Sequence, residues 1–541
     1  MYRLETLISL TRESGSLQAS KLIPFLITIA TFALYSWLRR SPGTKYPLPP
    51  GPLPLPIIGN IHQMSRSETW KQLVKLHAQY GPILTLKLGS RTIILLQTRA
   101  AVRDLLEKKA KFYSSRPRLI MVSEHLTRSL LPVMMPYDEN WKELHAVRGL
   151  VLSHHVAKAV TVVQQAASRY LAYRLLDQDA GAGTLEDAFC IYSCNSIATL
   201  LYGDDIGSMS LSEARQLESS VQKLIQSLNN HNVLLDLFPV LEKVPGLAWL
   251  TKSRARPFFT ELQSFFDAKL QAALARPAWN MARTLAERLP RHDHDRPDND
   301  RLIFLIGEIY MAGVATTPLA LGALATMATM HPTEVGILRA QLDLLVGPDR
   351  VPTFADTENL PYLHAFINES LRLKVILPLG IPHAISSSPN DGPQIYKGYH
   401  IPNDAFITPF QWAINRDPSV FADPHSFIPQ RWLDDANNSN NPLPATSLFG
   451  FGKRFCAGQP FAGNALAIAL AVLVWGFTFE PLPGFEGGDD DYRFVYVPPF
   501  EKMKVRVRSE AHRAIIAREW EGTEKGVQGV LDAIGREVGL V

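Results

Sequence analysis

The pattern of hydrophobic and polar positions changes its period along the chain. Residues 83–89 and 92–96 alternate apolar and polar positions, and the short segment between them suits a turn. We therefore expect a β-hairpin there, after a helix over 70–80 in which apolar residues recur every three or four positions. Over 99–331 the helical period dominates. The pattern predicts a mainly α fold with a smaller β part (α+β).

Two long apolar segments stand out in the second half of the chain. The first covers about 302–330 and contains Gly313 and Pro318, which would loosen a helix locally and make room for a small ligand. The second covers 461–479 and has Asn464 as its only strongly polar residue. Both patterns predict apolar helices.

A third apolar run, Leu22–Leu38, lies near the N-terminus and contains no charged residue. Its length is at the short end of a membrane span. A cleavable signal peptide is the alternative, but its apolar core would be shorter and a small-residue cleavage site would follow. A tryptophan and two arginines end the run instead. We expect 1–20 to be an N-terminal segment and 21–40 an uncleaved transmembrane anchor, with the following chain in the cytoplasm.

Proline recurs throughout residues 41–56 and stiffens them into an extended connector. A proline-rich ligand for another domain is the alternative, but the position of the segment favours a hinge between anchor and body. One catalytic domain is then expected over 57–508. Residues 509–541 have a helical pattern with glycine breaks, and we expect a mobile C-terminal tail.

Composition and charge exclude little. A chain of 541 residues with 46% hydrophobic residues can bury a large core. The formal net charge of +4 gives no reason to expect nucleic acid as a partner. Two of the three cysteines, Cys190 and Cys194, lie on a helical pattern and are expected in the core rather than in a metal pair or a disulfide.

The third cysteine, Cys456, lies between glycines directly before the second apolar helix, whose positive end favours a thiolate. Such a thiolate can be a nucleophile, a metal ligand or inert. Gly452 and Gly458 let the backbone pass close to a flat object, and Phe449 offers a ring beside the sulfur. Arg454 can clamp a carboxylate. These neighbours favour a planar ligand with an axial metal and carboxylates, which is the shape of haem.

The spacing F-x-x-G-x-R-x-C-x-G over 449–458 resembles the haem loop of the cytochrome P-450 superfamily. The resemblance implies a cytochrome P-450-like fold that binds haem b (iron protoporphyrin IX), with Cys456 as the axial ligand of the iron. It also implies an endoplasmic reticulum enzyme with a cytosolic catalytic domain. Electrons would come from NADPH through an NADPH-cytochrome reductase that docks near Lys453 and the helix of Trp141.

Two further motifs concern the haem carboxylates. Trp141 and His145 stand where the family has W-x-x-x-R, with both residues reaching one propionate. Histidine replaces the arginine here, so its contribution would depend on pH. Arg148, one turn further, is an alternative donor or a reductase contact. His383 stands where the family places another propionate donor.

Thr316 is the expected catalytic residue. Ala312, Gly313, Thr316 and Thr317 fit the family pattern A/G-G-x-D/E-T-T, in which the first threonine helps to relay protons to dioxygen. Ala315 stands in the position of the acid, so the resemblance leaves the usual proton route open.

Glu369 and Arg372 form an E-x-x-R pair, and Arg431 follows before the haem loop. The family joins such residues in a buried structural triad behind the haem.

The resemblance implies a haem-thiolate monooxygenase that oxidises a small, largely apolar metabolite, as in fungal specialised metabolism. Two alternatives stay open. An enzyme of the same family can couple phenols oxidatively without inserting oxygen, and a haem sensor or carrier can keep Cys456 without turnover.

Overall fold

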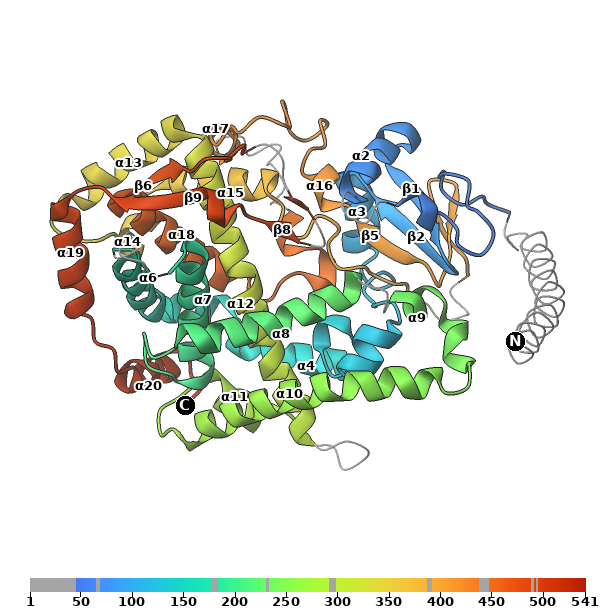
Figure 1. The fold of residues 1–541 in the computed structure, drawn as a ribbon, viewed down its shortest axis with the longest axis horizontal. Helices are drawn as coiled ribbons and strands as arrows, with labels where there is room; N and C mark the ends of the chain where they lie inside the picture. Colours follow the sequence, from blue (N-terminus) through green and yellow to red (C-terminus); the bar gives the residue numbers. More distant parts are fainter. Residues whose placement is uncertain are drawn as a thin grey trace, which may run out of the picture.

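The computed structural model describes residues 45–541 except 65–68, 177–182, 230–232, 291–297, 387–391, 437–446, 488–490 and 493–494. Figure 1 shows a large helical part beside a smaller part that contains the sheet of β1, β2 and β5. The described residues thus confirm the predicted mainly α fold with a smaller β part. The predicted anchor over 21–40 and the segment before it lie outside the described residues.

The α-helices follow one another through most of the described chain. They are α2 (Thr69–Tyr80), α3 (Arg99–Val102), α4 (Glu139–Val151), α5 (His154–Ala159), α6 (Thr161–Leu175), α7 (Leu185–Tyr202), α8 (Leu211–Asn229), α9 (Val233–Leu237), α10 (Leu247–Ala275), α11 (Met281–Arg288), α12 (Asp298–Met330), α13 (Pro332–Val346), α14 (Phe354–Glu358), α15 (Pro361–Leu373), α16 (Gln411–Ile414), α17 (Gln430–Ala436), α18 (Gln459–Gly476), α19 (Glu510–Glu521) and α20 (Gln528–Glu537).

Short 3-10 and π turns connect some of these helices. Those that bear on the site and its surroundings are η2 (Arg103–Lys108), η3 (Ile120–Leu126), η4 (Pro132–Met134), η6 (Pro239–Lys243), η8 (Ser447–Phe449) and η9 (Gly452–Arg454).

The β part contains the predicted hairpin. Strands β1 (Ile83–Leu88) and β2 (Arg91–Leu96) pair antiparallel, and β5 (Phe406–Pro409) adds in parallel to β2 from a distant part of the chain. The remaining strands form two-stranded pairs: β3 (Gln394–Tyr396) with β4 (Tyr399–Ile401), β6 (Phe477–Pro481) with β9 (Met503–Val507), and β7 (Asp491–Tyr492) with β8 (Tyr496–Val497).

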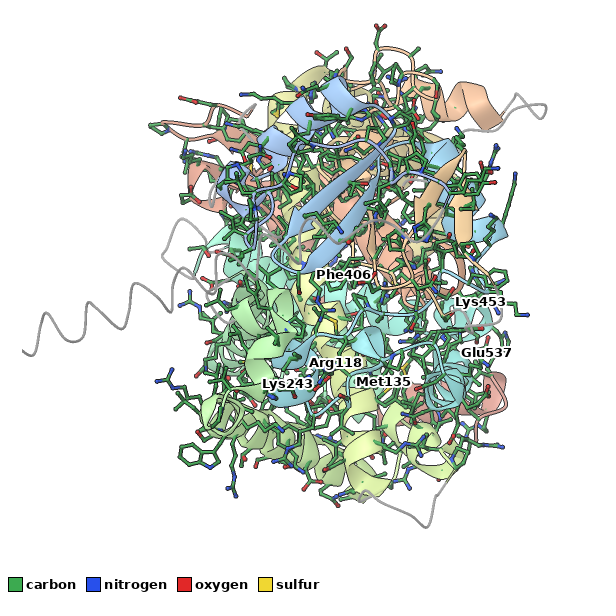
Figure 2. All side chains as sticks on the ribbon, turned by 90° about the vertical axis from the view of Figure 1, so that its right-hand side faces the viewer. Arg118, Met135, Lys243, Phe406, Lys453 and Glu537 are labelled. Atoms are coloured by element: carbon green, nitrogen blue, oxygen red, sulfur yellow. The ribbon has the colours of Figure 1, made fainter. Side chains whose placement is uncertain are left out.

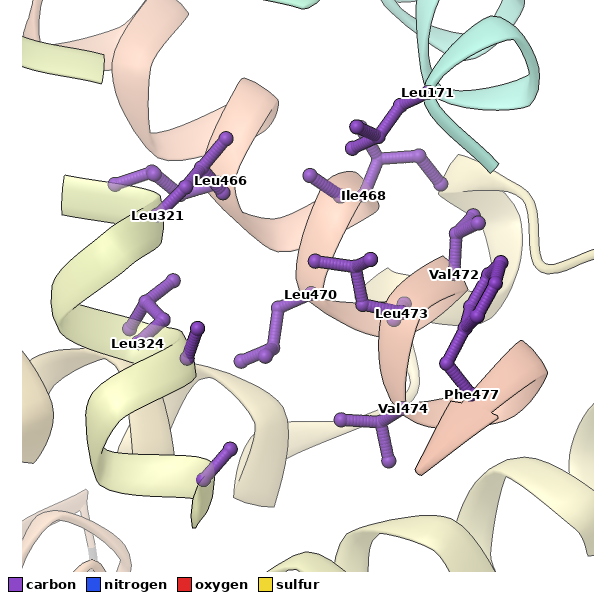
Figure 3. Close-up of a cluster of buried hydrophobic side chains, with 14 of the residues drawn as sticks. Leu171, Leu321, Leu324, Leu466, Ile468, Leu470, Val472, Leu473, Val474 and Phe477 are labelled. Atoms are coloured by element: carbon purple, nitrogen blue, oxygen red, sulfur yellow. The ribbon is translucent and has the colours of Figure 1, made fainter. Parts of the chain in front are cut away.

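Helices α12 and α18 pass through the hydrophobic core. In Figure 3, Leu321 and Leu324 of α12 pack beside α18, which presents Leu466 and Leu470. Both helices are long and apolar enough to cross a membrane, but most of each is buried inside the protein. They are therefore core helices, and the structure confirms the predicted helical pattern of both segments.

The predicted helix over 461–479 is wrong at its end. Helix α18 stops at Gly476, and Phe477 begins strand β6. Pairing with β9 satisfies the backbone groups of this apolar segment. Its partner strand lies more than twenty residues further along the chain, so the local pattern could not indicate the switch.

The prediction of a mobile tail after residue 508 is also wrong. Residues 510–537 form α19 and α20, in which Ile516, Trp520 and Leu531 are buried. The ring of Trp520 packs on Tyr170 of α6 with 4.7 Å between ring centroids. The apolar faces of the two short helices therefore belong to the core of the catalytic body.

Candidate active site

A cavity of about 450 Å³ lies between α12 and the loop that leads into α18. Its volume falls in the range of about 300–1,000 Å³ that is usual for small-molecule sites. The cavity brings together most of the predicted site residues from distant parts of the chain, namely Trp141, Thr316, His383, Phe449, Arg454, Cys456 and Gly458. His145 and Gly452 are not among its lining residues.

Cys456 presents its sulfur to this cavity. The turn η9 precedes it, and its backbone N–H donates to the carbonyl of Phe449 at 2.8 Å. The backbone N–H groups of Gly458 and Gln459, at the start of α18, donate to the sulfur and act to lower its pKa. A thiolate ligand needs such donors because they stabilise its charge.

The net pKa of Cys456 is nevertheless raised, chiefly by burial, and the nearby Arg148 and the two N–H groups only partly counteract this effect. The helix end therefore acts in the direction that the sequence predicted, while burial acts against it. A bound metal ion would lower the pKa of the sulfur further, because its charge stabilises a thiolate.

The structure explains the glycine at position 452 in a different way from the sequence, which predicted that it lets the backbone pass close to a flat ligand. Its φ is +58°, and a Cβ there would stand 2.1 Å from the carbonyl oxygen of Leu106 in η2. Close approach to this backbone, rather than to a flat ligand, requires glycine at this position. Gly458 does lie beside the sulfur, since a Cβ there would be 3.8 Å from Sγ of Cys456.

Two arginines line one edge of the cavity. Arg454 donates to the carbonyls of Ser114 (2.7 Å) and Met135 (2.6 Å), and Arg116 donates to the carbonyl of Pro382 (2.8 Å). Burial, together with mutual charge repulsion, lowers the pKa of Arg116 to about 9. Burial lowers the pKa of Arg454 to about 10. Two guanidinium groups at one part of the cavity are suited to anionic groups of a ligand.

Helix α4 begins with Asp138 as its N-cap, which accepts a hydrogen bond from the backbone N–H of Trp141. Trp141 is buried, and its ring stacks on that of His145 with centroids 4.5 Å apart. Burial and the charges of Arg148 and Arg454 lower the pKa of His145. His145 is therefore a neutral imidazole near pH 7, and the predicted pH dependence of its contribution does not follow.

His383 lines the cavity near the two arginines, since Arg116 donates to the carbonyl of the adjacent Pro382. Its Nδ1 lies 2.7 Å from the carbonyl oxygen of Tyr113, so Nδ1 carries the proton and donates it. Burial lowers the pKa of His383 well below its usual value, and the neighbouring Arg116 adds to the effect. In the neutral ring Nε2 is then an acceptor, and His383 donates to a carboxylate through Nε2 only when the ring is protonated.

Thr316 faces the cavity from α12, which runs unbroken through Gly313 and Pro318. The predicted local loosening is therefore not visible as a break in the helix. The Thr316 hydroxyl donates to the carbonyl of Ala312 at 2.8 Å. Ala315 also lines the cavity, and among the described lining residues the one carboxylate is Glu308, two turns earlier on α12.

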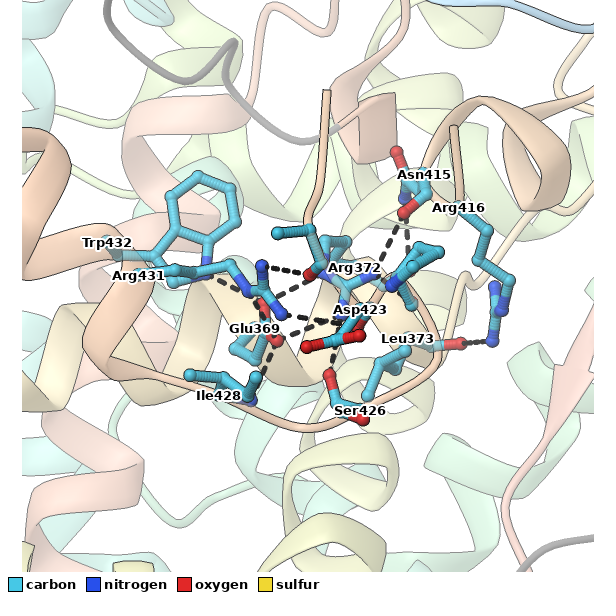
Figure 4. A network of polar contacts seen from close by, with 12 residues as sticks. Glu369, Arg372, Leu373, Asn415, Arg416, Asp423, Ser426, Ile428, Arg431 and Trp432 are labelled. Carbon is cyan, nitrogen blue, oxygen red and sulfur yellow. Dashed lines mark hydrogen bonds and ion pairs between the residues drawn. The ribbon is translucent and has the colours of Figure 1, made fainter. Parts of the chain in front are cut away.

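The predicted triad forms a buried network behind the cavity (Figure 4). The carboxylate of Glu369 accepts from Arg372 (2.8 and 2.9 Å), Arg431 (3.0 Å) and the Trp432 indole (2.9 Å). Burial raises the pKa of Glu369, but these donors outweigh it and the net shift is downward. The carboxylate is therefore ionised at neutral pH.

Asn415 connects this network to the cysteine loop. Its side chain donates to the carbonyl of Arg372 (3.2 Å) and accepts from the hydroxyl of Ser447 (2.7 Å), where the turn η8 opens the loop. Glu369 thus supports the loop through Arg372 and Asn415, without itself lining the cavity. Sequence reasoning had no signal for Asn415, because its role depends on a backbone carbonyl and a hydroxyl that the fold brings together.

The lining residues fit haem. A cysteine sulfur with two backbone donors can bind an axial metal, and the arginines at the cavity edge suit two carboxylates. Aliphatic side chains of Val221, Ile309 and Leu377 line other parts of the cavity, as a macrocycle needs. In addition, Nε of Arg148 is buried without a hydrogen-bond partner, which is costly unless a ligand supplies one.

Comparison with known proteins agrees with this geometry. The sequence pattern of the cytochrome P-450 family matches residues 49–505. The chain is 30% identical over 525 residues to cytochrome P-450 monooxygenase FrzL of Cladobotryum sp, covering 95% of this chain and 98% of that protein. It is 31% identical to cytochrome P-450 monooxygenase drtD of Aspergillus calidoustus, covering 94% of both chains. It is also 31% identical to fumitremorgin C synthase of Neosartorya fischeri, covering 91% of this chain and 94% of that protein.

Proposed function

The chain belongs to the cytochrome P-450 family, and from this premise we propose the roles of its site residues. The protein is a cytochrome P-450 monooxygenase, as are its relatives FrzL and drtD, and we propose that it acts in secondary metabolite biosynthesis. In our proposal Cys456 would bind the haem iron through its sulfur. Arg454 and Trp141 would hold the haem carboxylates, His383 would do so only when its ring is protonated, and the substrate is a small, largely apolar metabolite.

One observation carries this proposal most strongly: the sulfur of Cys456, with its two backbone donors, shares one cavity with Arg454, His383 and Thr316. When bound, thiolate-ligated haem supplies the activation of dioxygen. The chain contributes the cysteine that would bind the iron and the arginines that would pair with the haem carboxylates. It also contributes an apolar cavity for the substrate. The test is a screen of small compounds for a shift of the haem absorption band, since a compound that enters the cavity perturbs the haem.

Thr316 is assigned to proton delivery. Its hydroxyl borders the cavity and is anchored on the carbonyl of Ala312, which leaves its oxygen able to hold a water. Because Ala315 cannot exchange a proton, protons reach the reacting oxygen through Thr316 and water, or from a hydroxyl of the substrate.

The Thr316→Ala variant is expected to consume NADPH while hydrogen peroxide accumulates, and product per NADPH should fall at least about tenfold. The matched control is Thr329→Ala, which removes the same type of hydroxyl bond from α12 outside the cavity. Unchanged product per NADPH in Thr316→Ala would assign proton supply to the substrate. Ala315→Asp tests the same proton route. The new carboxyl group either restores an acid at this position or stays an unpaired buried charge, which costs several kcal/mol.

The proposed partners are a membrane and an NADPH-dependent reductase. The reductase face comprises Lys453, whose ammonium group donates to the Tyr137 hydroxyl at 2.7 Å, and the exposed side of α4. Figure 2 places Lys453 apart from Lys243, with Arg118 and Met135 between them. The two partners therefore have separate faces available.

An exposed apolar patch supports membrane contact on the side of Lys243. It is formed by two segments that meet at the turn between β1 and β2, where Ser90 donates to the carbonyl of Leu237 and Gly89 to that of Ile58. The patch consists of Leu53, Leu55, Ile57, Ile58, Leu234, Val240, Val244, Trp249 and Leu250. The first segment follows the predicted anchor by a short proline-rich connector, so a bilayer is the expected occupant.

Deletion of residues 1–40 is expected to release much of the protein from salt-washed membranes while haem stays bound. Adding Val240→Asp and Trp249→Asp should release the remainder, because each of these side chains contributes about 1.5–3 kcal/mol when buried in lipid. Leu344→Asp is the control, since Leu344 is even more exposed than Val240 and Trp249 but lies on α13 outside the patch. If the shortened double variant stays fully bound, another surface attaches the protein.

A further inference from the structure

The cavity holds an ion pair that no site assignment above uses. Glu308 of α12 and Arg148 of α4 both line the cavity, and their charged groups are 2.9 Å apart. Both side chains are largely buried, at 10% and 14% exposure respectively. A buried pair of this kind persists only where further hydrogen bonds satisfy both partners.

Glu308 has such a further bond. Its second carboxylate oxygen accepts from the backbone N–H of Val133 at 2.6 Å, and Val133 lies in η4 on the cavity wall. Burial raises the pKa of Glu308, and Arg148, the Val133 N–H, Arg454 and Arg116 counteract only part of the rise. The carboxylate thus lies in a cluster of cations and is fixed from two directions.

Arg148 in turn acts on His145. Its second terminal nitrogen lies 2.9 Å from Nδ1 of His145. A guanidinium group only donates, so Nδ1 accepts and the proton of the neutral ring is on Nε2. One nitrogen of Arg148, Nε, has no partner although it is buried.

With haem bound, the positive and negative charges in the cavity are equal in number only if Arg148 is counted as part of the site. Among the described lining residues the guanidinium groups are those of Arg116, Arg148 and Arg454, and the carboxylate is that of Glu308. Haem b carries two carboxylates. Together with Glu308 these give three negative charges for three positive ones, which removes the penalty of an unpaired buried ion.

We propose that Arg148, held by the positioning residue Glu308, is the cation that this chain places at the haem carboxylates in place of the arginine expected at 145. His145 supports it as a neutral ring stacked on Trp141, with its tautomer set by Arg148. This assignment rests on the proposed haem site and concerns only how the chain holds the haem.

The test compares variants of the full-length holoprotein by the rate at which haem moves to excess apomyoglobin. Arg148→Met combined with Glu308→Gln removes both charges and leaves no unpaired buried ion. We expect this double variant to lose haem about ten- to hundredfold faster than Glu308→Gln alone, because a charge-assisted bond to a carboxylate is lost. Arg148→Lys, which keeps the charge, should restore part of the retention.

The midpoint reduction potential of the haem gives a second readout that a purely structural role would not move. Reduction adds an electron near Arg148, so removing this cation should make the potential more negative, while Arg148→Lys should keep it. Lys142→Met is the matched control, because Lys142 lies exposed on the same helix, where it pairs with Glu139 and contacts the Tyr137 ring, and does not line the cavity.

Equal haem loss in the double variant and Glu308→Gln, with an unchanged potential, would overturn the proposal. A wild-type protein that takes up no haem would instead refute the proposed function, so the two failures are distinguishable.

Discussion

Replacement of Cys456 by serine is expected to abolish the absorption band that the reduced carbon monoxide complex of thiolate-ligated haem shows. A serine hydroxyl keeps the size of the side chain but is not ionised at neutral pH, so it cannot supply the thiolate. The backbone donors at Gly458 and Gln459 would remain, and so would the cationic edge of the cavity. NADPH-dependent product formation should fall to the level without enzyme.

Cys190→Ser is the control for this substitution. Cys190 is buried in α7 and is not a lining residue of the cavity. Its replacement should leave the band in place, although the buried hydroxyl costs some stability. Retention of the thiolate-type band in Cys456→Ser would remove Cys456 as the ligand.

Glu369→Ala is expected to lower the free energy of unfolding by about 3–5 kcal/mol, the usual cost of breaking a buried ion pair from one side. Arg372 is fully buried, and loss of its carboxylate partner leaves an uncompensated charge in the core. Arg431 and the Trp432 indole lose the same acceptor. Because Asn415 links Arg372 to the loop of Cys456, haem content should fall as well.

Denaturant unfolding followed by circular dichroism measures this effect. Glu480→Ala is the matched control, because it removes a carboxylate that pairs with Arg506 at the surface, where the loss should be about 0–1 kcal/mol. Similar losses in Glu369→Ala and Glu480→Ala would mean that the network behind the cavity does not support the fold.

The sequence was most informative where one segment carries the whole signal. The hairpin of β1 and β2, helix α2 and the buried helix α12 follow from the period of their own residues. The network of Glu369, Arg372 and Arg431 was predicted from motif order and is present as a set of contacts.

The sequence was least informative where distant segments meet. Arg116 comes from a loop, Arg148 from α4 and Glu308 from α12. Their spacing along the chain does not predict that they meet in one cavity. The packing of Trp520 against α6 was not predicted for the same reason. A helical pattern does not show which surface of the protein the helix will cover. The reason for Gly452 depends on the backbone of Leu106, more than three hundred residues earlier.

The most direct test of the proposed monooxygenase site is turnover in isotopically labelled dioxygen. The full-length protein would be combined with an NADPH-dependent reductase and a compound that shifts the haem absorption band. We predict a product that is heavier by one labelled oxygen atom and forms only with NADPH. A coupled product without labelled oxygen, or no NADPH-dependent product for any compound that binds, would contradict the assignment.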